Sequence, residues 1–182
     1  MASQAKLATA HGWTLLMHPF FELQLNALIQ KVEALKTKHP DNYTTKNDTK
    51  RLAAIEALVF DIIPQDPARS EYRQGATLGA QHKHWFRAKF FQQYRLFFRY
   101  HQASKIIVFA WMNDETTLRA YDSKTDAYQV FVRMLQNGNP PDDWEGLIAA
   151  TKLETLRADI HRGISSGTAK PLADVSRDSK KY

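Results

Sequence analysis

The sequence has no cysteine among its 182 residues. This absence excludes a disulfide framework, a cysteine-ligated zinc finger, an iron–sulfur cluster and a thiol nucleophile. The sequence also lacks an apolar run of the ~20 residues that a membrane span needs, and its N-terminus has no apolar core of signal-peptide length. We therefore expect a soluble, cytoplasmic protein without membrane contact. Its length fits one domain that can fold around its own core without a disulfide or a metal.

Acidic residues are absent from one long segment of the chain. Residues 72–113 contain none of the 19 aspartates and glutamates but seven of the 25 lysines and arginines. These seven are Arg73, Lys83, Arg87, Lys89, Arg95, Arg99 and Lys105. The rest of the chain has 18 cations against 19 acids, so the net charge of +6 arises entirely from this segment. The segment predicts a local surface that faces a polyanion, although strands are poor in acidic residues for structural reasons alone.

Two amphipathic helices are predicted in the first third of the chain. The first begins at Pro19, and apolar residues recur every three or four positions from Phe21 to Leu35. Turn-forming residues at 38–42 end it, and a second helix is predicted from about 45 to 63. Two helices of similar length with a short polar loop predict an antiparallel helical hairpin.

Strands and further helices are predicted after this hairpin. Residues 84–91, 94–100 and 105–111 are rich in aromatic and β-branched residues and predict an antiparallel meander, with 70–75 as a further edge strand. The pattern then favours helices at 114–121, 124–138 and 140–150. This order of elements is typical of an α+β fold. We divide the chain into a polar N-terminal lead-in at 1–17, a folded domain at 18–162 and a flexible tail at 163–182.

The predicted strands combine aromatic and basic residues on alternating faces. Between residues 84 and 100, eight of 17 residues are aromatic, four are basic and none is acidic. If the apolar face packs on the helical hairpin, the outer face presents Arg87, Lys89, Arg95 and Arg99. Such a face suits an RNA phosphate backbone, with Phe97 or a tyrosine available to stack on bases. A solvated sheet face with bound counterions is the alternative.

This surface predicts a particular chemistry. RNA cleavage without a metal needs a base for the 2′-hydroxyl, cations for the charge on the phosphorane, and an acid for the leaving oxygen. Clustered arginine and lysine supply the cations. A lysine whose pKa is lowered by its neighbours supplies a base, and an arginine, tyrosine or histidine such as His84 supplies an acid. The histidines His82, His84 and His101 have no further ligand at a convincing spacing, so we expect no metal and no cofactor.

Several motifs resemble the YhaV toxin family, a branch of the RelE-like toxins of type II toxin–antitoxin systems. They are HPFF (18–21), WFRAKF (85–90), YRLFFRY (94–100), WMNDETTLRAY (111–121), KTDAYQVFVRML (124–135) and NPPDDWE (139–145). The resemblance implies a RelE-like fold, with an N-terminal helical hairpin packed on a curved antiparallel β-sheet and C-terminal helices. It also implies an mRNA endoribonuclease that generally acts with the ribosome. A co-encoded PrlF-like antitoxin is the implied partner, and operator DNA is contacted only indirectly through that antitoxin.

The resemblance also implies roles for individual residues. Two cations that alternate on one strand of the RelE-like pattern match Arg87 and Lys89, and the arginine of the next strand matches Arg95. A later arginine and tyrosine match Arg119 with Tyr121 or Tyr128. The expected catalytic residues are Arg87, Lys89, Arg95, Arg119 and Tyr128. The expected RNA-binding residues are His84, Phe97, Arg99, Tyr121 and Lys124.

Alternatives remain open at the level of residues and of function. Arg95 has an alternative role in an ion pair with Asp114 or Glu115, and Tyr128 has one in the apolar stripe of a helix. A toxin on the same scaffold that binds a protein such as a gyrase without cleaving RNA is a second function, and a non-catalytic RNA-binding module is a third. An acidic antitoxin segment is expected to cover the basic face. Its docking surface is predicted at the apolar N-terminal segment (Trp13, Leu15 and Leu16) or at the helical C-terminus.

Overall fold

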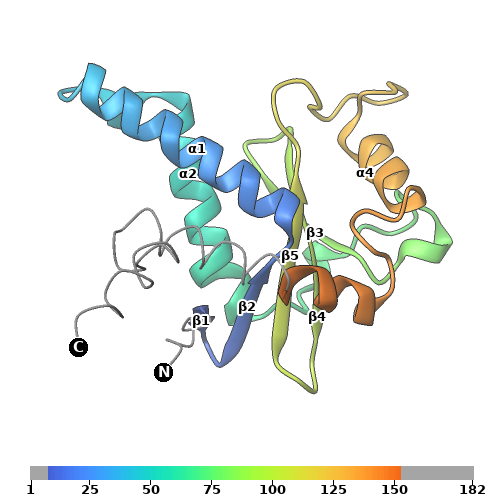
Figure 1. Ribbon diagram of the computed structural model, residues 1–182. Helices are drawn as coiled ribbons and strands as arrows, with labels where there is room; N and C mark the ends of the chain where they lie inside the picture. The colour runs from blue at the N-terminus through green and yellow to red at the C-terminus, as the bar shows by residue number, and fades with distance from the viewer. Residues whose placement is uncertain (1–7, 153–182) are drawn as a thin grey trace, which may run out of the picture.

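The computed structural model describes residues 8–152 and has the predicted α+β class (Figure 1). Five strands form one sheet in the order β1-β2-β5-β4-β3. The strands are β1 (Ala8–Ala10), β2 (Trp13–Met17), β3 (Phe86–Phe90), β4 (Tyr94–His101) and β5 (Ile106–Met112). The helices are α1 (Pro19–Lys38), α2 (Asn47–Ala57), α3 (Ile63–Gln65) and α4 (Ala127–Gln136), with a π-helical turn at Leu58–Ile62 and a further helical segment at 144–152. None of the helices in this part of the chain combines the length and apolarity that crossing a bilayer takes.

The predicted meander of three strands is present in the sheet. Strand β3 pairs antiparallel with β4, and β4 pairs antiparallel with β5. Strand β2 lies parallel to the other edge of β5, where Thr14 is opposite Ile106. Two parallel strands need a long connection. Here the connection from β2 to β5 contains all the elements from α1 to β4.

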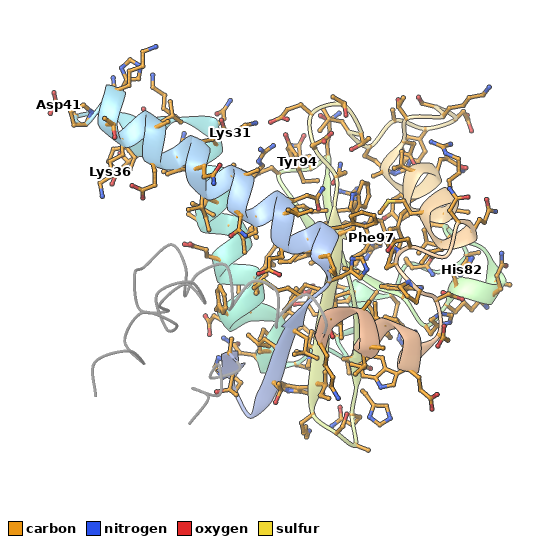
Figure 2. The ribbon with its side chains drawn as sticks, viewed as in Figure 1. Lys31, Lys36, Asp41, His82, Tyr94 and Phe97 are labelled. Atoms are coloured by element: carbon orange, nitrogen blue, oxygen red, sulfur yellow. The ribbon has the colours of Figure 1, made fainter. Side chains whose placement is uncertain are left out.

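Helices α1 and α2 pack over one face of the sheet. Helix α1 begins at Pro19 because proline is well suited to the first helical position, and the His18 Nδ1 atom accepts the Phe20 amide at 3.2 Å. The core between these helices and the sheet includes Phe21, Leu25, Leu28, Ile55, Leu96, Phe98 and Phe109. Lys36 and Asp41 lie at the distal end of the helix pair, which extends beyond the sheet (Figure 2).

Helix α4 and the segment 144–152 pack over the other face (Figure 1). The core on this side includes Trp85, Phe97, Trp111, Phe131 and Leu147. This arrangement corrects the prediction that the face with Arg87 and Arg95 is open to solvent. The alternating pattern correctly assigns Arg87 and Arg95 to one face. Three large aromatic residues, Trp85, Phe97 and Trp111, lie on the same face, and their burial requires a second layer of helices.

The N-terminal segment also differs from its prediction. Residues 8–17 are two strands of the sheet and not a lead-in. The chain reverses between them at His11 and Gly12, which both have positive φ values, of 48° and 81°. Trp13, Leu15 and Leu16 are buried in the cores, so they offer no docking surface to a partner.

Residues 114–121 form a loop where the sequence predicts a helix. The Asp114 carboxylate accepts hydrogen bonds from the Thr116 amide at 2.9 Å and the Thr117 hydroxyl at 3.1 Å. Such local side-chain bonds compete with those of a helix. The predicted edge strand at 70–75 is a 3₁₀ turn followed by one bridge, from Arg73 to Phe86. The predicted tail at 163–182 and residues 1–7 lie outside the described part.

Candidate active site

Two arginines from neighbouring strands meet at one tyrosine of α4. The Arg87 Nε atom donates to the Tyr128 hydroxyl at 2.8 Å, and the Arg95 Nε atom donates to the same hydroxyl at 3.3 Å. Tyr128 is fixed because it lies in the first turn of α4, where its amide donates to the Asp126 carboxylate that caps the helix. The beginning of α4 thereby places one hydroxyl against two guanidinium groups.

A third arginine approaches the same ring from the loop before α4. The Arg119 guanidinium lies 4.8 Å from the centre of the Tyr128 ring and 3.9 Å from that of Tyr121. It forms an ion pair with Asp126, which also accepts the Ala120 amide at 2.8 Å. The helix cap therefore positions Arg119 as well. Four of the five predicted catalytic residues, Arg87, Arg95, Arg119 and Tyr128, are thus in contact.

The charges of Arg87 and Arg95 are buried without a compensating acid. The two residues are 8% and 7% exposed. Neither guanidinium has a carboxylate partner within residues 8–152. Their bonds go to the Tyr128 hydroxyl and to backbone carbonyls of Glu71, Gln92 and Tyr94. Because a buried charge without a counter-charge is costly, this pair is poised for an anion.

The β3–β4 turn and a buried asparagine fix the position of Arg95. Phe91 and Gln92 have positive φ values of 44° and 60°, which non-glycine residues rarely adopt. This turn directs the Gln92 carbonyl to the Arg95 guanidinium at 2.7 Å. Asn113 Oδ1 accepts the Arg95 amide at 2.6 Å, and its Nδ2 atom donates to Gln93 and Thr117 carbonyls. Asn113 therefore positions Arg95. In the sequence it is recognisable as the polar residue that directly follows the apolar strand β5.

The fifth predicted catalytic residue, Lys89, lies at the mouth of this cluster. It is exposed on β3, directly opposite Arg95 in the sheet register. Lys89 and Arg87 line a groove of about 540 Å³ together with Leu58, Ile62, Ser70, Glu71, Tyr72, Arg73 and Ala88. The groove leads from the exposed edge strand to a buried arginine.

A second hollow adjoins the cluster at Arg119 and Tyr128. It measures about 280 Å³ and is lined by Arg119, Tyr121, Lys124 and Tyr128, among others. Tyr121 is 82% exposed, and its ring rests on the Arg119 guanidinium. Tyr121 and Lys124, two predicted RNA-binding residues, therefore line a hollow that also contains Tyr128 and Arg119.

Comparisons with known proteins identify the family. A family described as a toxin with endonuclease activity, of a toxin–antitoxin system, matches residues 15–152. The chain belongs to the YhaV toxin family. A toxin YhaV from Escherichia coli O6:H1 is 47% identical over 144 residues, which are 78% of this chain and 94% of the relative. The ribonuclease toxin YhaV of Escherichia coli strain K12 is 46% identical over the same shares of both chains. No solved structure matches.

Three RNA-binding residues predicted from the sequence lie elsewhere in this YhaV-family chain. Phe97 is labelled in Figure 2 and is fully buried. Its ring stacks on that of Phe131, with ring centres 4.2 Å apart, so it has no surface for a base. The Arg99 guanidinium lies between the Trp85 and Trp144 rings, at 5.6 and 5.4 Å from their centres. Burial lowers the pKa of Arg99, and nearby acids offset only part of that effect. The third residue, His84, lies beside Asp142.

That aspartate completes a group of residues able to hold a metal. Asp142 Oδ1 lies 3.2 Å from the His82 Nδ1 atom and 2.8 Å from the His84 Nε2 atom. Burial raises the pKa of Asp142, but hydrogen bonds from Trp85, His84 and His82 outweigh burial and hold the pKa below its ordinary value. Sequence spacing offers no sign of this group because Asp142 follows His84 by 58 positions.

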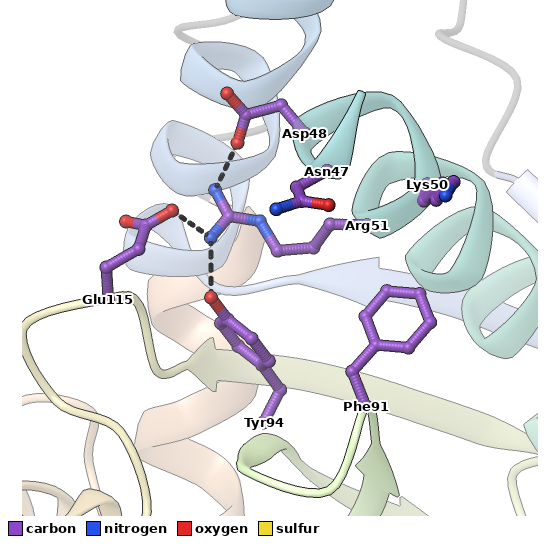
Figure 3. A pocket seen from close by; sticks show the side chains of 7 residues that line it. All are labelled: Asn47, Asp48, Lys50, Arg51, Phe91, Tyr94 and Glu115. Carbon is purple, nitrogen blue, oxygen red and sulfur yellow. Dashed lines mark hydrogen bonds and ion pairs between the residues drawn. The ribbon is translucent and has the colours of Figure 1, made fainter. Parts of the chain in front are cut away.

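A pocket lined by Arg51, Tyr94 and Glu115 contains an arginine that is paired with acids (Figure 3). Arg51 of α2 donates to Glu115 at 2.6 Å and to the Tyr94 hydroxyl at 3.3 Å, and it also contacts Asp48. The pKa of Glu115 lies below its ordinary value because its own backbone amide and the nearby Arg51 stabilise the carboxylate, against the effect of burial. The alternative role of Arg95, in an ion pair with Asp114 or Glu115, is wrong: Glu115 pairs with Arg51, and Arg95 has no ion pair within residues 8–152.

Proposed function

We propose that this protein is the endoribonuclease toxin of a type II toxin–antitoxin system and cleaves RNA without a metal. One observation carries the proposal: two buried guanidinium groups, of Arg87 and Arg95, share the Tyr128 hydroxyl and have no carboxylate partner in the described chain. The ribonuclease activity named for its E. coli relative supports the choice of RNA as the anion. The fold that fits this function is RelE-like, with α1 and α2 as its helical hairpin.

The proposed reaction is attack of the 2′-hydroxyl on the adjacent phosphorus, with loss of the 5′ oxygen. A phosphate in the groove beside Lys89 replaces the missing counter-charge of Arg87 and Arg95, which stabilise the additional negative charge of the phosphorane. Tyr128 accepts hydrogen bonds from both arginines, so its own proton is free for the leaving 5′ oxygen. The Lys89 amine is the proposed general base for the 2′-hydroxyl.

We expect the RNA on either side of this phosphate to bind in the two hollows, at Lys89 and at Tyr121. Tyr121 provides an exposed ring on which a base can stack, and base–aromatic stacking contributes about 1–3 kcal/mol per base. Lys124 lies beside it and binds a neighbouring phosphate. Arg73 offers a further cation on the side of Lys89. The RNA path we propose therefore crosses the sheet edge, and it leaves out Phe97, Arg99 and His84.

The proposed partners follow from the same surface. We expect an acidic segment of a PrlF-like antitoxin to occupy the groove at Arg87 and Lys89, because it supplies the missing counter-charge. The proposed substrate is mRNA on the ribosome in the cytoplasm, and operator DNA is contacted only through the antitoxin. A complex whose antitoxin leaves Arg87 and Lys89 open to solvent would contradict direct masking.

The test is induction of the chain alone in cells, with mRNA 5′ ends mapped beside an Arg95→Ala variant. New ends clustered in coding frames, and absent with the variant, are expected. An Asp41→Ala variant at the distal end of the α1–α2 pair is the matched control and should cut as the unchanged chain does. Growth arrest with intact mRNA would favour a protein target such as a gyrase. Strongly salt-dependent RNA binding without cleavage products would favour a non-catalytic RNA-binding module.

A further inference from the structure

Two histidines and an aspartate from distant parts of the sequence meet at the beginning of β3. The His82 and His84 ring nitrogens and Asp142 Oδ1 all lie within 4.8 Å of one another. The carboxylate is also held from a third direction, because the Trp85 indole donates to the same oxygen at 2.7 Å. The three possible ligand atoms are thus already gathered by the fold.

These atoms have the chemistry of zinc ligands, and the two distances from Asp142 are close to those of a zinc site. Imidazole nitrogen and carboxylate oxygen bind Zn²⁺ at ~2.0–2.2 Å, and in a tetrahedral site such bonds place two ligands about 3.3 Å apart. The observed separations from Asp142 Oδ1 are 3.2 Å to His82 and 2.8 Å to His84. A shift of a few tenths of an ångström in the partly exposed His84 ring brings its distance from Asp142 into that range. The His82 and His84 nitrogens lie within 4.8 Å of each other, and movement of the same ring brings them together around the ion.

The group is partly buried and leaves one side open to a cation. His82 is 6% exposed, while His84 and Asp142 each keep about a third of their side-chain surface open to solvent. An ion can therefore enter from one side, and water can complete its coordination. Arg99 is a neighbouring cation, but it donates to the backbone carbonyl of Asp142, at 2.6 Å, and not to the carboxylate.

We propose that His82, His84 and Asp142 bind one Zn²⁺ ion. The ion links the start of β3 to the segment that begins the 144–152 helix, and so holds the helical layer over the sheet. Its role is structural, because three successive ring contacts, Trp85–Phe131, Phe131–Phe97 and Phe97–Tyr128, lie between this group and the arginine cluster. The proposal is independent of the ribonuclease reaction.

The experiment uses the full chain, made without a histidine tag and treated with EDTA before desalting. Zn²⁺ alone is then added, and bound metal and thermal unfolding are measured. One zinc ion per chain is expected. Its binding should raise Tm by roughly 5–10 °C at a hundredfold excess over Kd. EDTA should reverse the increase.

Two pairs of variants decide the assignment. His84→Gln and Asp142→Asn should each lower zinc affinity at least tenfold and abolish the increase in Tm. His101→Gln and Asp143→Asn change a nearby histidine and a nearby carboxylate outside the group and should leave both unchanged. Absence of zinc binding in the unchanged chain would overturn the proposal. So would binding that His84→Gln and Asp142→Asn leave intact, which would place the ion elsewhere.

Discussion

The two ends of the sheet face beneath α4 use arginine in opposite ways. At one end Arg87 and Arg95 are buried against a tyrosine hydroxyl and carbonyl groups, and neither has an acid beside it. At the other end Arg99 is packed between two tryptophan rings and bound to the carbonyl of Asp142. All three arginines alternate with apolar residues on the same two strands. The contacts of an arginine, and not its place in the pattern, show whether it is packed between aromatic rings or left without an acid.

The largest expected effect compares these two ends directly. Arg95→Met should lower RNA cleavage by about 10²-fold or more, because it removes a cation that stabilises the transition state. It should leave the free energy of unfolding unchanged or higher, since a buried charge without an acid costs stability. Arg99→Met should instead lower the free energy of unfolding by about 2 kcal/mol, through lost cation–π contacts and a hydrogen bond.

Cleavage of mRNA in a cell-free translation system and unfolding in urea measure the two properties. Cleavage per folded molecule should stay within a few-fold of normal in Arg99→Met. If Arg99→Met is as inactive as Arg95→Met while still folded, RNA runs along the whole face and the contrast between the two ends disappears.

Tyr128→Phe tests the hydroxyl that joins the two arginines. The ring stays in the core, so the free energy of unfolding should fall by only about 1 kcal/mol, as expected for one lost hydrogen bond. Cleavage should fall by about 10- to 100-fold, because the proposed acid is lost and both guanidiniums lose their common acceptor. The rate is measured in the same cleavage assay. A fully active Tyr128→Phe protein would make this tyrosine a packing residue, like Phe131.

Sulfate provides a smaller effect that needs no RNA. An anion that binds between Arg87 and Arg95 should raise Tm by about 2–4 °C for each kcal/mol of binding free energy gained. Arg95→Met should lose this part of the increase, and Arg99→Met should keep it. Scans in sodium chloride of the same ionic strength correct for screening. An equal sulfate response in all three proteins would mean that only the general effect of sulfate on burial is seen.

The smallest effect concerns Arg51, an arginine that has two acids beside it. Glu115→Gln should lower the free energy of unfolding near neutral pH by about 0.5 kcal/mol, because the Glu115 carboxylate is more than half exposed. The folded pKa of Glu115 lies below the ordinary value of 4.5, so its contribution is present above that pH and is lost as the pH falls below it. Urea unfolding at several pH values should show the two proteins converging in acid. A difference that persists in acid would contradict the ion-pair role.

Much of the fold follows from local pattern. The helical spacing of apolar residues from Phe21 to Leu35 predicts α1. The aromatic and β-branched residues at 84–111 predict the meander, because they alternate as strand residues do. The pattern misses β2, whose five residues are too short to show a period. It also misses the loop at 114–121, where the Asp114 side chain competes with the helix for backbone donors.

The site is predictable in its residue types and not in its partners. Alternation and the YhaV resemblance together indicate Arg87, Lys89 and Arg95, and the structure places them with Arg119 and Tyr128. Neither could indicate that Phe97 is covered, because the helix that covers it is set by tertiary packing. The group at His82 depends on Asp142, which only the folded chain brings near.

The parallel pairing of β2 with β5 has a consequence for synthesis. Thr14 leaves the ribosome early, yet its strand partner Ile106 is made much later, and such non-local pairing slows folding. The arginine cluster combines residues of β3, β4 and the beginning of α4. A nascent chain that ends before Tyr128 therefore lacks part of the cluster. The cluster can therefore form only after Tyr128 has emerged from the ribosome.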